Sequence, residues 1–435
     1  MELPAGEVMG EAVYDPDNPA LERVLRDLPE GLWRYADHAR LLVHFIATKR
    51  WGREVERWGF ARLHSAILRG YIPNAVLGPL KTYLVEARVI QSSPHSAGRY
   101  STGYRIGSGF DGRPRRVLLT HPQLVRKLRE WRAAYCRPGN GVPESLIERR
   151  GRVLDHMRED LARLHLAKPT EEVLSDLARI DVDPDHACYI CSAIQHGDHA
   201  GVKVDAFGYR VHSIVTRTDA EIRPYLRIDG KPLVELDIAN SQPLILAIAL
   251  KSPDTWTTYI ASGQHIGGGG AGSSPVEVLL PAIPVEELRG FTRLCENGEL
   301  YEFLMAQGEF DDREEVKRLL FRDVLFGKPC VNGPMTKVFA RHWPACLEFL
   351  RETKRAYGHK AVAQALQRLE SAIIIDGVCG RLVREHPDTH FVTIHDSALA
   401  VPDSVAAVRR IMREEFERRG VRASVREKNV RMCLT

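Results

Sequence analysis

The sequence of 435 residues predicts an α+β protein with more than one domain. Amphipathic, charge-rich helical segments dominate the part of the chain before Phe207. From Phe207 onward, short strand-like runs and turns appear, and helices resume from Glu299 before a last strand, Phe391–Asp396. A chain of this length exceeds what a single hydrophobic core usually organises, so two or three domains are expected.

Residues 36–106 predict a helical unit followed by a hairpin. Residues 36–51 and 54–68 have helical apolar spacing, and residues 72–91 read as a third helix that runs into a strand at Arg88–Gln91. A basic, turn-rich tip and a returning strand, YRIG, follow. Three helices before a two-stranded wing is the order of a winged helix, so we expect a winged-helix-like domain. Such a domain suits DNA binding, and docking to another protein is the alternative.

Composition excludes several classes of protein. Hydrophobic content of 44% and charged content of 27% are typical of a soluble globular chain. The acidic N-terminus lacks the apolar core of a signal peptide, and the run Leu244–Leu250 is too short to span a membrane. We therefore expect a cytoplasmic protein, and we expect it to be a monomer. Its eight scattered cysteines are expected to be free thiols.

The net charge of +4 is unevenly distributed. Between Arg99 and Arg152, thirteen Lys or Arg residues stand against four acids, with Tyr100, Tyr104, Trp131 and Tyr135 among them. Basic residues interleaved with aromatic ones are typical of a surface that binds a polyanion. A solvated helix face is the alternative interpretation.

Residues 186–199 contain a cluster of five potential metal ligands. Any four of its five side chains could close a tetrahedral zinc site. The alternative is that the two cysteines are small buried residues of an amphipathic helix. The members of the cluster are His186, Cys188, Cys191, His196 and His199.

Two aspartates stand at the exits of apolar strands: LVEL leads into Asp237, and FVTIH leads into Asp396. Burying a carboxylate is costly unless a cation receives it. Two such strands side by side would present two carboxylates that hold two divalent ions for phosphoryl transfer. Oxygen ligands of this kind favour Mg²⁺, with Mn²⁺ as the alternative. Each aspartate alone would equally fit a turn cap.

Between these aspartates, Arg313, Lys317, Phe321 and Leu325 recur every fourth residue and are expected to share one helix face. Two cations one turn apart, followed by apolar residues, would hold a triphosphate and stack against a base. An ordinary amphipathic helix is the alternative. The Gly/Ser-rich segment 262–275 lacks the Gly-Lys-Ser/Thr ending of a P-loop, so it predicts a mobile loop.

Taken together, GYRVHS, IRPYLRIDGKPLVELDIANSQPLILAIA, DREEVKRLLFRDVLFG and FVTIHDS resemble, in order and character, the palm and fingers motifs of the family A DNA polymerases. Bacteriophage-type single-subunit RNA polymerases share that core. The resemblance covers Phe207 to the C-terminus. It implies a right-hand polymerase with an antiparallel palm sheet, helical fingers and a helical thumb.

The resemblance also implies roles for single residues. Asp237 and Asp396 match the aspartates that bind two metal ions and are catalytic. Residues matched to nucleotide binding are Arg313, Lys317, Arg318, Phe321, Gln242 and Phe326, and those matched to primer and template are Arg210, His395 and Gln367.

The chain departs from the family pattern in four ways, one of which is that it is too short for a family-type exonuclease domain. Gln242 falls where the DNA polymerases carry a glutamate that crowds the sugar 2′ position, and it is still large enough to occupy that space. Ser397 replaces the acid that follows His-Asp in DNA polymerases and is more similar to the RNA polymerases. The Phe326-Gly327 pair lies one residue late against Lys317, and the shifted frame would make Arg318 the triphosphate ligand.

We therefore expect a DNA-directed DNA polymerase without a proofreading exonuclease, with primed DNA and nucleoside triphosphates as partners, acting in plasmid, phage or mobile-element replication. Alternatives are a single-subunit RNA polymerase or primase, a non-catalytic DNA-binding replication protein, and a metal-dependent phosphohydrolase with a His-Asp pair. The expected domains are an N-terminal extension (1–35), a winged-helix-like domain (36–118), a helical thumb-like region (119–205), palm (206–250 and 359–435) and fingers (251–358).

Overall fold

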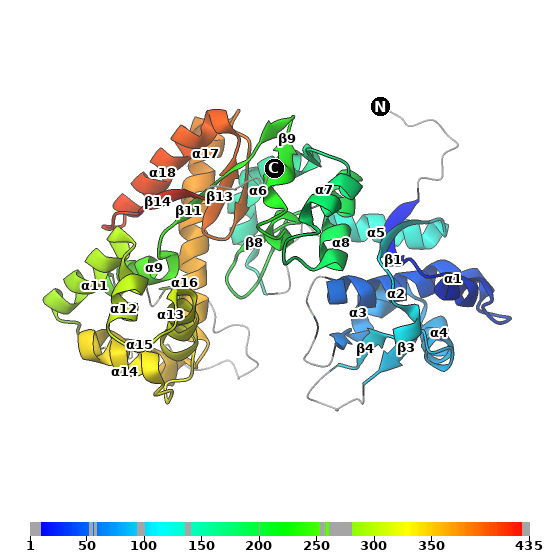
Figure 1. The fold of residues 1–435 in the computed structure, drawn as a ribbon, viewed down its shortest axis with the longest axis horizontal. Coiled ribbons are helices and arrows are strands. Elements are labelled where there is room, and N and C mark those ends of the chain that lie inside the picture. Colours follow the sequence, from blue (N-terminus) through cyan, green and yellow to red (C-terminus); the bar gives the residue numbers. More distant parts are fainter. Residues whose placement is uncertain are drawn as a thin grey trace. The chain divides into compact units, whose positions relative to one another are not determined.

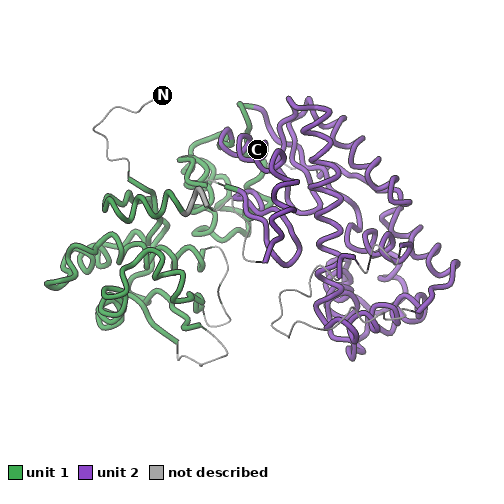
Figure 2. The backbone as a smooth tube through the Cα atoms, turned by 180° about the vertical axis from the view of Figure 1, so that it is seen from behind, with its two compact units in different colours: residues 1–136, 164–201, 217–230 green, residues 137–163, 202–216, 231–435 purple. Residues whose placement is uncertain are grey.

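The computed structural model describes residues 10–51, 55, 59–93, 101–134, 141–199, 201–252, 256, 258–260 and 281–428, without the side chains of 131–134. Two compact units divide the chain (Figure 2). Unit 1 comprises residues 1–136, 164–201 and 217–230, and unit 2 comprises residues 137–163, 202–216 and 231–435. Both contain helices and antiparallel strands, which confirms the α+β class. The Gly/Ser-rich segment 262–275 lies outside the described residues.

One part of unit 1 alternates helices with a small sheet. In this part β4 is the middle strand of a three-stranded antiparallel sheet in the order β2-β4-β3. Its core is apolar side chains that face inward from the three helices, such as Leu42, Leu68 and Leu80. The elements in chain order are α2 (Ala36–Trp51), β2 (Ala61–Arg62), α3 (Ser65–Tyr71), α4 (Asn74–Glu86), β3 (Ile90–Ser92) and β4 (Gly103–Ile106).

In the rest of unit 1, β1 pairs with β5 and β6 pairs with β9, both antiparallel. Every residue of β1 is buried, including Asp15, whose carboxylate pairs with Arg40 and Arg115. A buried carboxylate requires such partners. The elements are β1 (Glu11–Pro16), α1 (Pro19–Arg26), β5 (Pro114–Leu119), α5 (Pro122–Ala134), β6 (Leu164–Leu166), α7 (Thr170–Leu177), α8 (Pro184–Gln195) and β9 (Leu226–Ile228).

A four-stranded antiparallel sheet in the order β12-β13-β11-β14 organises unit 2 (Figure 1). The two-residue turn His395-Asp396 joins β12 to β13, with His395 at φ 55°. Helix α18 packs against β11, β13 and β14, and α6 packs against β12. The elements are α6 (Glu144–Ala162), β7 (Lys203–Val204), β8 (Val211–His212), β10 (Lys231–Pro232), β11 (Val234–Ile238), β12 (Phe391–Ile394), β13 (Ser397–Ala400), α18 (Val405–Glu417) and β14 (Val425–Lys428).

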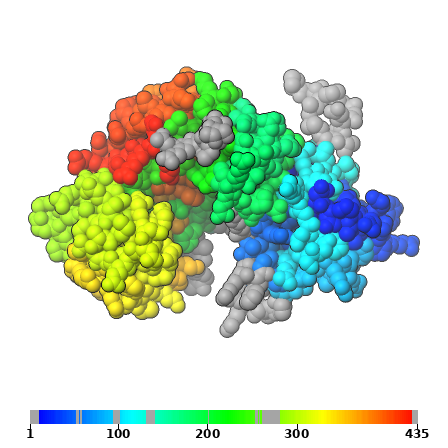
Figure 3. Space-filling model, in the orientation of Figure 1, coloured from blue at the N-terminus to red at the C-terminus, as the bar shows by residue number. Residues whose placement is uncertain are grey.

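Helices make up the remainder of unit 2. Those from α11 to α15 gather into one helical body, yellow-green to yellow in Figures 1 and 3. Both α13 and α16 continue into π-helical segments, η6 and η7, and such segments recur at functional sites. The elements are α9 (Ser241–Lys251), α11 (Val285–Asn297), α12 (Leu300–Ala306), α13 (Arg313–Leu319), η6 (Leu320–Leu325), α14 (Pro334–His342), α15 (Pro344–Tyr357), α16 (Ala361–Ser371), η7 (Ala372–Cys379) and α17 (Gly380–Glu385).

Candidate active site

The two strand-exit aspartates lie on neighbouring strands of the unit 2 sheet. Asp237 is on β11, which pairs with β13 in the register Leu236↔Ala398. Asp396 sits in the turn that immediately precedes β13. The Ser397 hydroxyl donates a hydrogen bond to Asp237 Oδ1 at 2.6 Å, which ties the two strands together at this level. The sheet therefore brings the two carboxylates to the same end of two neighbouring central strands.

The charged side chains at this end of the sheet act on each other. Burial raises the pKa of Asp396 to about 6, and the negative charge of Asp237 adds to the rise. The Lys428 ammonium on β14 lies 3.2 Å from Asp237 Oδ1 and 2.9 Å from Glu235 Oε1. A cation therefore already contacts one of the two carboxylates, and the other is held at a raised free energy when ionised.

This donor set fits a divalent cation with a preference for oxygen. Two carboxylates supply protein ligands, and Mg²⁺ typically completes its shell with water and substrate phosphates. Within the described ranges, the structure has no group of three or more His, Cys, Asp or Glu side chains arranged to hold a metal.

Arg210 lies in a loop between β7 and β8 that its own hydrogen bonds shape. The Asp205 carboxylate accepts hydrogen bonds from the backbone N–H groups of Phe207, Gly208 and Arg210, at 2.7 to 3.0 Å. Burial opposes ionisation of Asp205, but its hydrogen bonds, above all that with His212, outweigh burial and hold its pKa at about 2. The loop is therefore internally braced.

Helix α16 holds this loop from the other side. Arg368 donates hydrogen bonds to the carbonyls of Phe207 and Ala206, and Ser371 Oγ donates to Tyr209 O at 2.5 Å. A Cβ at Gly208 would lie 2.6 Å from Gln367 Oε1 and 2.7 Å from Gln367 Cβ. The glycine of GYRVHS is thus required by the close approach of the loop to α16.

A third acid, which the sequence motifs did not indicate, lies beside the pair. Glu370 on α16 is 1% exposed, and its Oε1 accepts from Arg210 Nε and Nη2, both at 2.6 Å. Burial raises the pKa of Glu370 to about 7, with a further contribution from the charge of Asp396, against the Arg210 ion pair. The sequence signal that could have found Glu370 is an acid next to an apolar run, here AIII, as is the case for Asp237.

Gln242 in the first turn of α9 also contacts Glu370. Its Nε2 donates to Glu370 Oε2, whereas its Oε1 is buried and has no hydrogen-bond partner among the described residues. The side-chain amide of Asn240, at φ 53°, is likewise buried, and neither of its polar atoms has a described partner. Buried polar atoms are normally paired, so a ligand is a natural source of the missing partners.

His395 holds a strained position that suits a functional turn. Its φ of 55° lies in the left-handed region, which costs free energy for a residue with a Cβ. Its ring packs edge-on against that of His212, with the ring centroids 5.5 Å apart. The structure thus brings His395 and the Arg210 loop together.

The expected helix face of the fingers is only partly present. On α13, Lys317 is exposed and Arg313 is half-buried. Arg313 pairs with Glu302 at 2.9 Å and lies over the ring of Tyr301. After Leu319 the helix becomes π-helical, and the extra residue per turn moves Leu325 into the core. The prediction that Leu325 shares a face with Arg313 and Lys317 is therefore wrong.

The two aromatic residues expected in the fingers, Phe321 and Phe326, lie near the start and just past the end of the π-helical segment. Phe321 and Phe326 are half-buried, and their rings pack edge-on with centroids 5.2 Å apart. A Cβ at Gly327 would lie 2.3 Å from the Arg322 carbonyl oxygen, so this position requires glycine. Arg318 is exposed and pairs with Glu315. Whether the motif is aligned on Lys317 or on Arg318, the expected triphosphate ligand is therefore a cation at the surface.

The potential zinc ligands do not converge. His186 is buried and its ring nitrogens contact the carbonyls of Trp51 and Arg217, at 2.5 and 2.9 Å. Cys191 is buried, Cys188 Sγ faces the Pro114 carbonyl, and His196 is exposed. These contacts favour the interpretation as ordinary helix residues over the zinc site.

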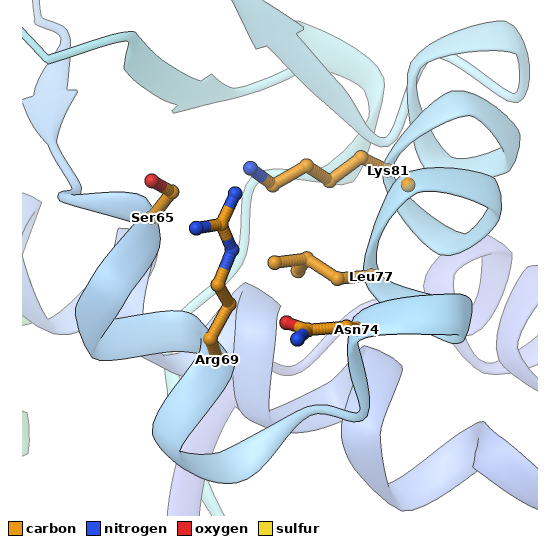
Figure 4. A pocket seen from close by; sticks show the side chains of 6 residues that line it. Ser65, Arg69, Asn74, Leu77 and Lys81 are labelled. Atoms are coloured by element: carbon orange, nitrogen blue, oxygen red, sulfur yellow. The ribbon is translucent and has the colours of Figure 1, made fainter.

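A second polar feature lies in unit 1, where α3 and α4 line an open surface pocket of about 360 Å³. Figure 4 shows the Arg69 guanidinium and the Lys81 ammonium directed into the same space, near the Ser65 hydroxyl. None of the lining residues is acidic, so two positive charges converge there. Such a pocket suits an anion. Its lining residues are Ser65, Arg69, Asn74, Leu77, Gly78 and Lys81.

Comparison with known proteins leaves the family open. No family model and no curated protein matches the chain. Among solved structures, it is similar to the POL domain of Pol1 from M. smegmatis in complex with DNA primer-template and dNTP, at 12% identity, 71% coverage of this chain and 72% of that chain. The TM-score of 0.30 is too low to assign a fold, so we take the function from the residues of the site alone. In the parts of the chain that the structure describes, no helix has the length and apolar composition to cross a bilayer.

Proposed function

We propose that this protein is a template-directed nucleotidyltransferase, and in particular a DNA-directed DNA polymerase without proofreading. The observation that carries the proposal is that Asp237 and Asp396 lie at the same end of two neighbouring strands of an antiparallel sheet, with the Lys428 ammonium against Asp237. Two carboxylates on rigid strands suit a site for two Mg²⁺ ions. When bound, the metal would lower the pKa of the attacking primer hydroxyl and offset the charge of the triphosphate.

The chain's own residues would then position the reactants. Arg313 and Lys317 would pair with the triphosphate, and Phe321 or Phe326 would stack against the base. Arg210, His395 and Gln367 would contact the primer–template. Because base pairing reads the sequence, the protein needs only contacts to the backbone and checks of shape. In this scheme residues 206–250 and 359–435 are the palm, 251–358 the fingers and 119–205 a thumb-like region.

For the product we favour DNA, because Gln242 falls where the DNA polymerases carry a glutamate that crowds the sugar 2′ position, and a glutamine would still be large enough to exclude a 2′-hydroxyl. Ser397 is the observation that favours the runner-up, an RNA polymerase or primase. In this chain, however, the Ser397 hydroxyl is engaged with Asp237 rather than available to the nucleotide.

Primer extension tests the proposal. Purified protein with Mg²⁺ should extend a primed DNA template with deoxynucleotides, and Asp396→Asn should abolish extension while leaving the protein folded. Better extension with ribonucleotides would move the assignment to an RNA polymerase, and synthesis without a primer would move it to a primase. Metal-independent DNA binding with no product would indicate a non-catalytic replication protein, and untemplated nucleotide hydrolysis would indicate a phosphohydrolase.

We further propose that residues 36–118 form a winged-helix-like domain that docks on DNA. The order α2-β2-α3-α4-β3-β4, with β4 in the middle of the sheet, supports this. The pocket with Arg69 and Lys81 supports contact with the phosphate backbone rather than with a protein, because two cations without a lining acid favour a polyanion. Duplex binding by the full-length protein, compared with an Arg69→Gln/Lys81→Gln variant, tests this.

A further inference from the structure

We infer that Glu370 is a positioning residue that sets how Gln242 faces the sugar of the incoming nucleotide. The inference rests on the proposed function. Glu370 on α16 is almost completely buried and joins two other elements: one carboxylate oxygen binds Arg210, and the other accepts from Gln242 Nε2 on α9. A single carboxylate thus connects the residue matched to the primer terminus with the residue matched to the sugar.

The hydrogen bonds determine which end of the Gln242 amide faces Glu370. The Arg210 guanidinium has only donors, so it engages Glu370 Oε1 as an acceptor, and both contacts measure 2.6 Å. Oε2 accepts from the amide nitrogen of Gln242. The amide is thereby oriented, and its oxygen points away from Glu370.

The hydrogen bond to Glu370 also fixes where the bulk of the Gln242 side chain lies. The side chain is buried, and Glu370 Oε2 is the acceptor that holds its amide nitrogen. A side chain that is held in one conformation excludes a sugar 2′-hydroxyl more strictly than one that can rotate away. Glu370 therefore keeps Gln242 in place at the sugar position.

Glu370 is specific to this role among the residues of α16 that hold the Arg210 loop. Arg368 and Ser371 bind backbone carbonyls of that loop, and neither contacts Gln242 in any hydrogen bond of the described structure. Removal of Glu370 would therefore release Gln242, while these neighbours continue to hold the loop. The effect expected is on the choice of sugar, beyond any effect on stability.

The test measures sugar discrimination in the full-length protein. The ratio of kcat/KM for dATP to that for ATP is compared between wild type and Glu370→Gln on one primed template. The same ratio is measured from equilibrium dissociation constants in the complex with a primer that lacks a 3′-hydroxyl. We expect Glu370→Gln to shift both ratios toward ATP by about tenfold, because the Gln242 side chain is no longer held against the 2′-hydroxyl, with most of the change in KM.

Two further variants separate positioning from structure. The exchange of Glu370→Gln together with Gln242→Glu keeps the net charge and restores a donor–acceptor pair. In this double variant the new amide on α16 donates and the new carboxylate on α9 presents an oxygen, so the ratio should be restored. The matched control is Glu415→Gln, because Glu415 is a buried carboxylate in unit 2 that binds Arg381, Arg418 and Arg419 away from the site. Its substitution should lower stability and leave the ratio unchanged.

The outcomes are distinct. An unchanged ratio in Glu370→Gln, an equal shift in Glu415→Gln, or no recovery in the exchange variant overturns the inference while the proposed function stands. If wild type extends no primer, the proposed function fails, and the binding ratio alone decides the inference: equal ratios in wild type and Glu370→Gln overturn it.

Discussion

Lys354 allows the electrostatic cost of one buried cation to be measured. It lies on α15, is 4% exposed, and its Nζ donates to the Val324 carbonyl of the π-helical segment at 2.5 Å. Burial lowers the pKa of Lys354 from 10.5 to about 8, and the charge of Arg351 adds to the shift. We predict that Lys354→Met changes how the stability of unit 2 depends on pH.

The sign follows from the two pKa values. Below pH 8 the lysine is protonated in both states, so the folded state carries the full cost of the buried charge. As the pH rises from 8 toward 10.5, the folded state loses its proton first and that cost disappears. The cost is about 3 kcal/mol at pH 7.5 and about 1 kcal/mol at pH 9.5. Wild type should therefore gain about 2 kcal/mol relative to Lys354→Met between these pH values.

Urea unfolding followed by circular dichroism at about pH 7.5 and about pH 9.5 measures this difference. Comparison with the variant cancels the tyrosines and other groups that titrate in the same range. The exposed lysine Lys360 gives a control, since Lys360→Met should show the same pH dependence as wild type. Parallel stability curves for wild type and Lys354→Met would refute the reasoning, because they would mean that the ammonium is solvated in the folded state.

Three other perturbations follow from the structure. Lys428→Met removes the ammonium that competes for the aspartate pair, so the Mg²⁺ concentration for half-maximal extension should fall, and an unchanged or higher requirement counts against the metal site. Gly208→Ala places a Cβ against Gln367, so we expect a loss of about 1–3 kcal/mol in stability and weaker primer–template binding; wild-type values for both would contradict the close approach. Arg69→Gln and Lys81→Gln should each lower the slope of log affinity for duplex DNA against log salt by about 0.9, whereas an unchanged slope would place the phosphates elsewhere.

Much of the local structure was predictable from short-range patterns. Apolar spacing predicted the helices that became α2 and α4, and the β-branched run before Asp396 predicted β12, whereas part of the helix expected at 54–68 is the strand β2. The helix that we expected in the fingers shows where this reasoning stops. A repeat of four residues assumes α-helical geometry throughout, and the π-helical turn after Leu319 breaks that assumption because the tertiary packing of α14 and α15 accommodates an extra residue.

The candidate site shows the same division. An acid at the exit of an apolar strand is unusual enough to identify Asp237 and Asp396 from the sequence, because the cost of burying a carboxylate restricts where one is placed. The roles taken by Glu370 and Lys428 depend on contacts across 128 to 193 residues of chain, which no local pattern encodes. The same holds for the zinc alternative. His186 and Cys188 are close in sequence, but in the folded chain each contacts different backbone carbonyls.

By itself, then, the sequence determined the class of fold, some of the helices and the two acids with the most unusual surroundings, because these depend on periodicity and on the cost of burial. Only the tertiary structure decided which groups share a site. Sheet pairing set Ser397 against Asp237, and the packing of α16 beside α9 gave Glu370 both Arg210 and Gln242 as partners. Hydrogen bonds of this kind act over about 3 Å, so they depend on how distant segments meet rather than on the order of residues along the chain.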